Sequence, residues 1–411
     1  MTVAKGSRTF FRDDGPGLAS LIENLSAVQP AQWTANQPAP APGSVRILII
    51  RCGAIGDTLM ATPLVRALRR TYPSAHLVFL CSETAHDLLR YNPHLDQVIA
   101  LGQRHVPFWL SPEKSRVLRK LAQLDLDWTL ALESHPSFVD LARRAGAKRT
   151  IVYGTPPDAA GFARAGWDPA RHSIENNLRS AEPLEVRPSS LDPPGPEPGF
   201  EMELHYPAAL DQNLQQRLSR AGVNPGDRLV GIHAGWGGRK HSIENTRLKS
   251  WPPDRFAQIA SWLVESGAQV VLTGSQADWP LTEFIRERAG RRTKPLLNWA
   301  GELSILELAA LIRRLDLYLA IDSGPAHMAA ALGTPLVALL GPAIIEQTRP
   351  VAGRGPVRIL YERVPCAPCY GTPLMKSCQD NICMKAIEVE QVKAAMLELL
   401  AAASSNASPR R

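Results

Sequence analysis

The segment Asp322-Ser-Gly-Pro-Ala-His327 combines residue types that can hold an anion. It lies between the apolar run LYLAI and the helix-forming run AHMAAALG, where a strand passes into a helix. Asp322 or Ser323 can cap that helix, and Pro325 is tolerated in its first turn. The free N–H groups and dipole of a helix start favour negative charge, so the turn at Gly324 predicts a diphosphate site. Ser323 and His327 would add donors, although a lone histidine is more often structural.

A second candidate is the loop Gly53-Ala-Ile-Gly56-Asp57, which follows the apolar run at 45–50 and precedes a helical pattern. Open α/β sheets bind ligands beyond the carboxyl ends of their strands, and glycines let the backbone approach a ligand closely. The spacing matches neither GxGxxG nor a P-loop, which excludes both of those interpretations. Asp57 would lie near the helix N-terminus, where capping the helix and serving the site are both open.

Lys249 precedes Ser-Trp-Pro-Pro and the helical pattern RFAQIASWLVESG. A lysine in a loop is usually a solvated charge. Beside HAGWGG and before a helix start, Lys249 could instead pair with a phosphate as a point charge. Arg239 and Lys240 are basic alternatives nearby, and spacing does not choose among the three.

Four cysteines, Cys366, Cys369, Cys378 and Cys383, lie within one loop-rich stretch. Their spacing resembles a tetrahedral thiolate site, so we predict a structural zinc or iron there. The wide second gap departs from a zinc ribbon, and the alternative is four free thiols in a reducing compartment. The other two cysteines, at 52 and 81, are expected to be ordinary buried thiols.

These candidates require a scaffold of alternating strands and helices. Apolar runs such as 45–50 and 317–321 suit strands buried on both faces of a parallel sheet, and the segments between them show helical periodicity. The alternation predicts an α/β chain of two doubly wound units. The expected divisions are an N-terminal extension and linker at 1–43, one domain at 44–205, a second at 226–385, a cysteine-rich loop at 364–384, and a helix and tail at 386–411.

Composition excludes several classes of protein. Apolar residues make up 45% and charged residues 21%, as in soluble globular proteins. No apolar run is long enough for a membrane span and the N-terminus lacks a signal-peptide pattern, so a cytoplasmic location is expected. The net charge of +7 favours phosphates or an anionic membrane surface. A zinc-ribbon nucleic-acid-binding protein is the alternative from another class, but basic and aromatic residues are not interleaved as it requires.

Three motifs in order resemble glycosyltransferase family 9, the ADP-heptose:lipopolysaccharide heptosyltransferases. They are ILIIRCGAIGDTLMATPLVRALRRTYP at 47–73, LKSWPPDRFAQIA at 248–260 and NWAGELSILELAALIRRLDLYLAIDSGPAHMAAALGTPLVALLGP at 298–342. The resemblance implies the GT-B fold, in which two Rossmann-like doubly wound domains face each other across a cleft. The first domain would bind the acceptor and the second the nucleotide sugar.

The resemblance also implies roles for individual residues. Asp57 would be the general base, with Gly53 and Gly56 in the acceptor-side loop. Lys249 would bind the donor phosphate. The donor diphosphate loop would contain Asp322, Ser323, Gly324, Pro325 and His327. The four cysteines are similar to an iron-binding motif in a branch of the family that heptosylates proteins.

The implied reaction is an inverting, metal-independent transfer of a heptose from an ADP-heptose-like donor. The acceptor would be a lipid-linked glycan of the lipopolysaccharide core at the inner membrane surface, and no cofactor or nucleic acid is required. Transfer to a protein and another nucleotide-sugar reaction such as epimerisation are the alternatives. Two departures from the family, the N-terminal extension and the long segment before Lys249, leave donor and acceptor open.

Overall fold

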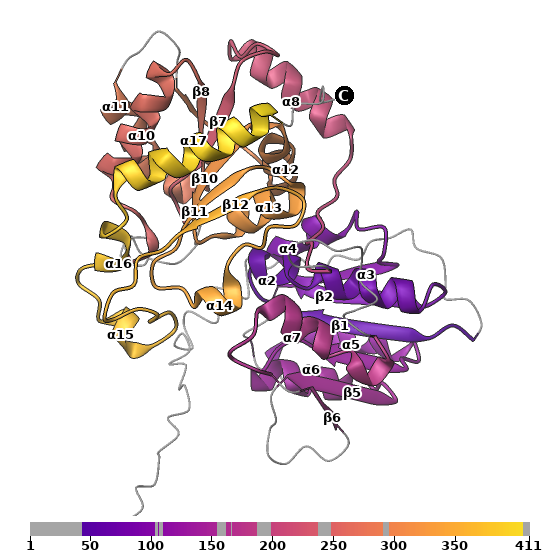
Figure 1. Ribbon diagram of the computed structural model, residues 1–411. Helices are drawn as coiled ribbons and strands as arrows, with labels where there is room; N and C mark the ends of the chain where they lie inside the picture. The colour runs from indigo at the N-terminus through magenta and orange to yellow at the C-terminus, as the bar shows by residue number, and fades with distance from the viewer. Residues whose placement is uncertain are drawn as a thin grey trace, which may run out of the picture.

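The computed structural model describes residues 43–102, 106, 110–153, 162–165, 167–186, 199–236, 248–290 and 296–405, of which 162–165 and 403–405 are described by their backbone only. Two parallel β-sheets flanked by helices form the two halves of the chain (Figure 1). This confirms the predicted α/β architecture of two doubly wound units. The predicted N-terminal extension and linker at 1–43 lie outside the described residues, apart from residue 43.

The first half is built around a sheet in which every pair of neighbouring strands is parallel. Its elements are β1 (Arg46–Arg51), α2 (Ile55–Leu59), α3 (Thr62–Thr71), β2 (His76–Ser82), α4 (Glu83–Leu89), β3 (Gln97–Leu101), α5 (Pro112–Ala122), β4 (Trp128–Ala131), α6 (Pro136–Arg144), β5 (Arg149–Tyr153), β6 (Phe162–Ala165), α7 (Ser173–Arg179) and the 3₁₀ turn η2 (Glu182–Leu184). The strand order is β3-β2-β1-β4-β5-β6. The order reverses direction between β1 and β4, and such a switch point is where open α/β sheets bind ligands.

The second half repeats this plan. Its elements are α8 (Ala209–Arg220), β7 (Leu229–His233), α10 (Pro253–Glu265), β8 (Gln269–Thr273), the 3₁₀ turn η4 (Gln276–Asp278), α11 (Trp279–Ala289), β9 (Leu297–Asn298), α12 (Ile305–Arg314), β10 (Leu317–Ile321), α13 (Gly324–Leu332), β11 (Leu336–Leu339), α14 (Ile345–Thr348), β12 (Val357–Leu360), α15 (Pro373–Lys376), α16 (Ile382–Lys385) and α17 (Val389–Ser405). The strand order, β12-β11-β10-β7-β8-β9, again reverses at the first strand of the half, between β7 and β10.

The single helix that the sequence pattern predicts after the Asp57 loop is two helices. The break falls at Met60 and Ala61, between α2 and α3. Pro63 has no N–H for the carbonyl of Leu59, so continuing the helix would leave that carbonyl without its usual partner. The hydroxyl of Thr62 donates to the Leu59 carbonyl at 2.7 Å instead. The short α2 can therefore point toward the second half independently of α3.

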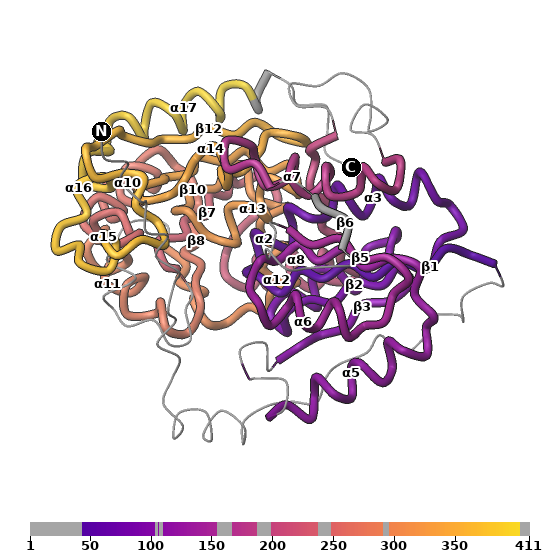
Figure 2. The backbone as a smooth tube through the Cα atoms, turned by 90° about the horizontal axis from the view of Figure 1, so that it is seen from below, coloured from indigo at the N-terminus to yellow at the C-terminus, as the bar shows by residue number. Residues whose placement is uncertain are grey.

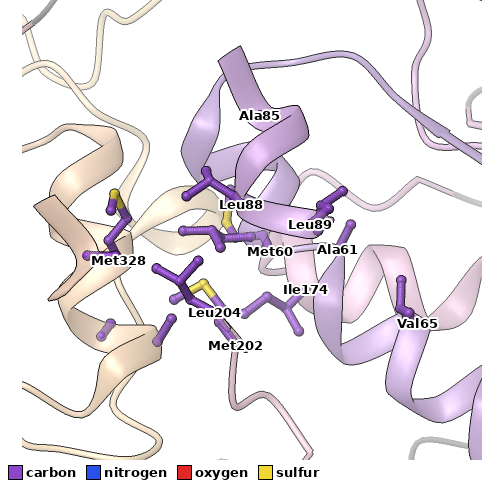
Figure 3. Packing of buried hydrophobic residues seen from close by; sticks show 14 of the residues in the cluster. Met60, Ala61, Val65, Ala85, Leu88, Leu89, Ile174, Met202, Leu204 and Met328 are labelled. Atoms are coloured by element: carbon purple, nitrogen blue, oxygen red, sulfur yellow. The ribbon is translucent and has the colours of Figure 1, made fainter. Parts of the chain in front are cut away.

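The two halves share one apolar core where they meet. In Figure 3, Met328 from α13 faces Leu88 from α4 and Met60 from the end of α2, with Leu204 from the connecting segment beside them. These side chains are almost completely buried. Helices α2 and α13 lie side by side in both views of the chain and pack against each other (Figures 1 and 2). The packing brings the first turns of α2 and α13 together.

The C-terminal helix α17 packs on α10 and on strands β10, β11 and β12, and thus covers the second sheet rather than bridging both halves (Figure 1).

The connection between the halves is anchored to the first half. Arg66 of α3 donates to the carboxylate of Glu203 at 2.9 Å and to the carbonyl of Glu201 at 2.8 Å. Across the described part of the chain, no helix is both long and apolar enough to span a bilayer.

A buried histidine joins the halves on a second side and makes their contact sensitive to pH. Nδ1 of His172 accepts from the N–H of Ile174 at 3.2 Å, so Nε2 carries the proton and donates to the carbonyl of Arg349 at 3.0 Å. Burial lowers the pKa of His172 to about 4. Below its unfolded pKa of 6.5, the unfolded chain binds a proton that the folded chain does not.

The free energy of unfolding should therefore fall as the pH drops from 6.5 toward 4. His172→Gln keeps a donor toward Arg349 but cannot titrate. The free energy of unfolding of this variant should fall less steeply with decreasing pH than that of the wild type. The two slopes should differ by at most about 1.4 kcal/mol per pH unit. Urea denaturation at a series of pH values measures both slopes. Equal slopes for the variant and the wild type would show that His172 does not remain neutral in the folded protein.

Candidate functional site

Asp57 lies in the first turn of α2, just beyond the carboxyl end of β1. Its Oδ2 accepts from the N–H of Ala54 at 3.0 Å, so the capping interpretation is correct. Its Oδ1 accepts from Arg51, the last residue of β1, at 2.8 Å. Arg51 also lies 3.8 Å from Glu133, which follows β4. The side chain of Asp57 is 32% exposed, so a bound molecule can still reach the carboxylate.

The surroundings keep the Asp57 carboxylate ionised. Burial alone would raise its pKa, but the Arg51 guanidinium, the Ala54 N–H and the nearby His327 together hold the pKa below the usual 3.8. The close approach depends on Gly53, where a Cβ atom would lie 2.5 Å from Oδ2 of Asp57. The loop thus presents a charged proton acceptor at the switch point of the first sheet.

The segment 322–327 lies at the corresponding edge of the second sheet. Asp322 follows β10, Ser323 occupies the N-cap position of α13, and Pro325 lies in the first turn. The hydroxyl of Ser323 donates to the carbonyl of Ile321 at 3.0 Å, and no side chain caps the helix. The predicted side-chain cap is therefore not formed. An uncapped helix start with its dipole behind it is suited to an anion.

Lys249 brings a positive charge to this helix start. Its Nζ donates to Oδ2 of Asp322 at 2.8 Å, and the two side chains are only 5% and 13% exposed. The ammonium also lies 5.0 Å from the centre of the Trp236 ring and 4.1 Å from that of Tyr370. The structure thus places Lys249 beside the segment 322–327, whereas Arg239 and Lys240 lie outside the described residues.

His327 connects the two halves of the site electrostatically. Burial lowers its pKa, as does Lys249, while the carboxylates of Asp322 and Asp57 act in the opposite direction. The residue is 4% exposed, and its Nδ1 has no hydrogen-bond partner among the residues that the structure describes. A buried nitrogen without a hydrogen-bond partner destabilises the protein, and a bound molecule that forms the missing hydrogen bond would offset that cost. The neutral imidazole is therefore available to a ligand.

Two glycines allow the halves to approach so closely. A Cβ atom on Gly56 would lie 2.7 Å from Cδ2 of His327, and one on Gly324 would lie 2.8 Å from Cβ of Ile55. Both distances are shorter than carbon atoms tolerate. The glycines therefore set the distance between the Asp57 loop and the start of α13.

Gly56→Ala should impair function through this contact alone. Alanine is about 1 kcal/mol more favourable than glycine inside a helix, so α2 itself should not be destabilised. Displacing Asp57 relative to His327 should lower the rate of the expected sugar transfer by up to about a hundredfold. Steady-state rates and thermal unfolding measure the two effects. Gly226→Ala is the matched control, because its Cβ atom would meet nothing within 4 Å. Full activity of Gly56→Ala would show that the contact is unimportant.

The four cysteines of the loop lie near one another. Burial and the other three thiols raise the pKa of Cys383 to about 11. In the described part of the chain, however, no group of three or more His, Cys, Asp or Glu side chains could hold a metal ion. The thiols as arranged do not themselves form the predicted zinc or iron site, which stays a prediction for elemental analysis of the purified protein. Cys52 and Cys81 are buried, as expected.

Sequence reasoning missed three side chains of the site. Arg51 ends an apolar strand, and a single basic residue at a strand end was the available signal. Trp236 directly precedes a segment that the structure does not describe. Tyr370 belongs to the cysteine-rich loop, and nothing in the spacing of the sequence connects it with Lys249.

Comparisons with known proteins find similar glycosyltransferases. A model of glycosyltransferase family 9 (heptosyltransferase) matches residues 238–376. Lipopolysaccharide heptosyltransferase 3 of Escherichia coli K12 is 26% identical over 293 residues, which cover 70% of this chain and 79% of the relative. A glycosyltransferase family 9 structure from Veillonella parvula has a TM-score of 0.71 at 23% identity, over 87% of this chain and 97% of that one. The ADP-heptose lipopolysaccharide heptosyltransferase II structure from E. coli has a TM-score of 0.68 at 21% identity, over 87% and 99%.

Two sheets of Rossmann strand order, with a carboxylate at one switch point and an anion site at the other, have the GT-B fold. The family-model match and the heptosyltransferase relatives make the chain a glycosyltransferase. Within that class, the chain is similar to glycosyltransferase family 9 (heptosyltransferase) over residues 238–376 and to lipopolysaccharide heptosyltransferases at about 26% identity.

Proposed function

We propose that the protein transfers a heptose from an ADP-heptose-type donor to the lipopolysaccharide core or a related glycan, with inversion at the anomeric carbon and no metal ion on the donor diphosphate. The observation that carries the proposal is that the ionised Asp57 lies near His327, a buried histidine whose Nδ1 has no partner among the described residues. The names of the relatives supply the heptose and the lipopolysaccharide.

In the proposed reaction, Asp57 accepts the proton of an acceptor hydroxyl. The hydroxyl oxygen forms a bond to the anomeric carbon as the bond from that carbon to the diphosphate oxygen breaks. Attack from the face opposite the leaving group inverts the configuration. Arg51 would keep Asp57 ionised and correctly oriented until the acceptor arrives.

The departing diphosphate takes both electrons of the broken bond and gains negative charge. The first N–H groups of α13 would stabilise that charge, because no side chain caps this helix start. Lys249 would add its positive charge, because its ammonium is held at Asp322 beside the same helix start. The neutral imidazole of His327 carries one N–H group, which would donate a hydrogen bond to the diphosphate. These groups supply the positive potential that a divalent ion provides in other transferases, which is our reason for proposing a metal-independent reaction.

Donor screening tests the proposal. Isothermal calorimetry should show tighter binding of ADP and ADP-sugars than of UDP- or GDP-sugars. Transfer should survive EDTA, and nuclear magnetic resonance of the product should show the inverted anomer. Equal, weak binding of all nucleotides would contradict the heptosyl proposal, and loss of transfer in EDTA would contradict metal independence. If a protein accepted the sugar and glycans did not, the proposed glycan acceptor would be wrong and the acceptor would be a protein. The cytoplasmic location, peripheral to the membrane, remains a prediction.

A further inference from the structure

The cysteine-rich loop 364–384 contacts the segment that carries Lys249. The amide of Asn381 donates to the carbonyl of Ser250 at 2.8 Å. The next residue, Trp251, donates through its indole to the carbonyl of Ile387, just after the loop, at 2.8 Å. The Tyr370 ring lies over the ammonium of Lys249. Three successive residues, 249–251, are thus contacted by the loop or the residues that follow it.

The loop is itself fixed to the carboxyl edge of the second sheet. The N–H groups of Cys369 and Tyr370 both donate to the carbonyl of Pro342, at 3.1 and 2.9 Å. Pro342 lies shortly after β11, and the thiol of Cys383 packs against the neighbouring Gly341, where a Cβ atom would meet Sγ at 3.1 Å. Cys369 and Cys383 are buried, whereas Tyr370 between them is 45% exposed. These contacts therefore fix the part of the loop from which the Tyr370 ring projects over Lys249.

The ammonium of Lys249 has three neighbours, one carboxylate and two aromatic rings. The Asp322 carboxylate neutralises it, and the rings of Trp236 and Tyr370 present their negative faces to it. A cation held against aromatic faces keeps a defined position without losing its charge. A lysine side chain has four flexible carbon–carbon bonds, and ordering them on phosphate binding costs conformational entropy. Because these neighbours already confine Lys249, most of that entropy is lost before the phosphate binds.

We propose that Tyr370 is a positioning residue for Lys249, and that the cysteine-rich loop is a part of the donor site because it supplies this ring. The inference rests on the proposed function, in which Lys249 binds the donor diphosphate. It gives the loop a role that depends on the ring of Tyr370 and not on whether the thiols hold a metal ion.

Two variants of Tyr370 and two measurements test the inference. Isothermal calorimetry with ADP should show that Tyr370→Leu binds about threefold to tenfold more weakly than the wild type, because it lacks the aromatic face. Tyr370→Phe keeps the ring and should bind within about twofold of the wild type. Acetylation of Lys249 by an amine-reactive ester, followed by mass spectrometry, should be about threefold faster in Tyr370→Leu, because the ammonium is less confined. Leu374→Ala, also exposed in the loop, is the control and should match the wild type in both measurements.

The outcomes separate this inference from the proposed function. If the wild type binds none of ADP, UDP and GDP, the proposed function is wrong, and the acetylation of Lys249 alone decides whether Tyr370 positions it. If the wild type binds ADP and Tyr370→Leu binds it equally well, the inference is wrong although the proposed function stands. If Tyr370→Phe loses as much affinity as Tyr370→Leu, the hydroxyl matters rather than the ring, and the inference is also wrong.

Discussion

Asp57→Asn should transfer sugar about 10²- to 10⁴-fold more slowly than the wild type while binding ADP with unchanged affinity. Asparagine has the shape of aspartate and can still accept from the Ala54 N–H, so the start of α2 should remain capped. It cannot take a proton from the acceptor. The groups proposed for the diphosphate lie in the second half of the chain, which explains why ADP binding should survive.

Asp127→Asn is the matched control. That carboxylate is also ion-paired, with Lys148 at 2.8 Å, but it precedes β4 and so lies at the opposite edge of the same sheet. Steady-state transfer rates and calorimetry with ADP provide the comparison. If Asp57→Asn lost ADP binding and transfer to the same extent, the role of Asp57 would be purely structural.

The pH dependence of the transfer rate tests whether the Asp57 carboxylate is ionised in the working enzyme. The ionised carboxylate is the active form of a base, and the pKa of Asp57 lies below 3.8. The transfer rate should therefore show no acid limb from this residue between about pH 5 and about pH 8. A limb in that range that disappears in Asp57→Asn would mean that the pKa is raised and not lowered.

Lys249→Met should lower the transfer rate about 10²- to 10³-fold by removing a positive charge from the departing diphosphate. Methionine retains much of the length of the side chain. The change leaves the carboxylate of Asp322 buried and unpaired, which should also destabilise the fold by about 3–5 kcal/mol. The two effects must be separated before the activity is interpreted.

The double variant Lys249→Met/Asp322→Asn separates them. It removes both charges, so thermal unfolding should return toward the wild-type midpoint while transfer stays low. Lys148→Met, at an exposed lysine that is also paired at 2.8 Å, controls for the loss of a cation. Recovery of transfer together with stability in the double variant would show that Lys249 serves only to neutralise Asp322.

Much of the fold could be predicted because the information is local. The apolar runs at β1, β7 and β10 are long enough to identify buried strands, and the periodicity after them identifies helices. The break between α2 and α3 could not be read from periodicity, because apolar spacing continues through Pro63. Edge strands such as β9 and β12 were missed, since they are short and only half-buried.

Parts of the site were predictable for the same reason. Asp57 and the segment 322–327 each lie between a strand and a helix, so their place at a sheet edge follows from neighbouring residues alone. Lys249 was one of three basic candidates, because its partner Asp322 is distant in the sequence. Tyr370 was not a candidate at all.

The sequence by itself therefore determined which turns carry the chemistry, since a turn is specified by the few residues around it. Only the tertiary structure decided which turns meet: that Gly56 packs against His327, that Arg51 pairs with Asp57 across one loop, and that Tyr370 covers Lys249. The physical reason is that contacts between the halves depend on how two separate cores bury their apolar faces against each other. That packing is a property of the whole chain, and short segments do not encode it.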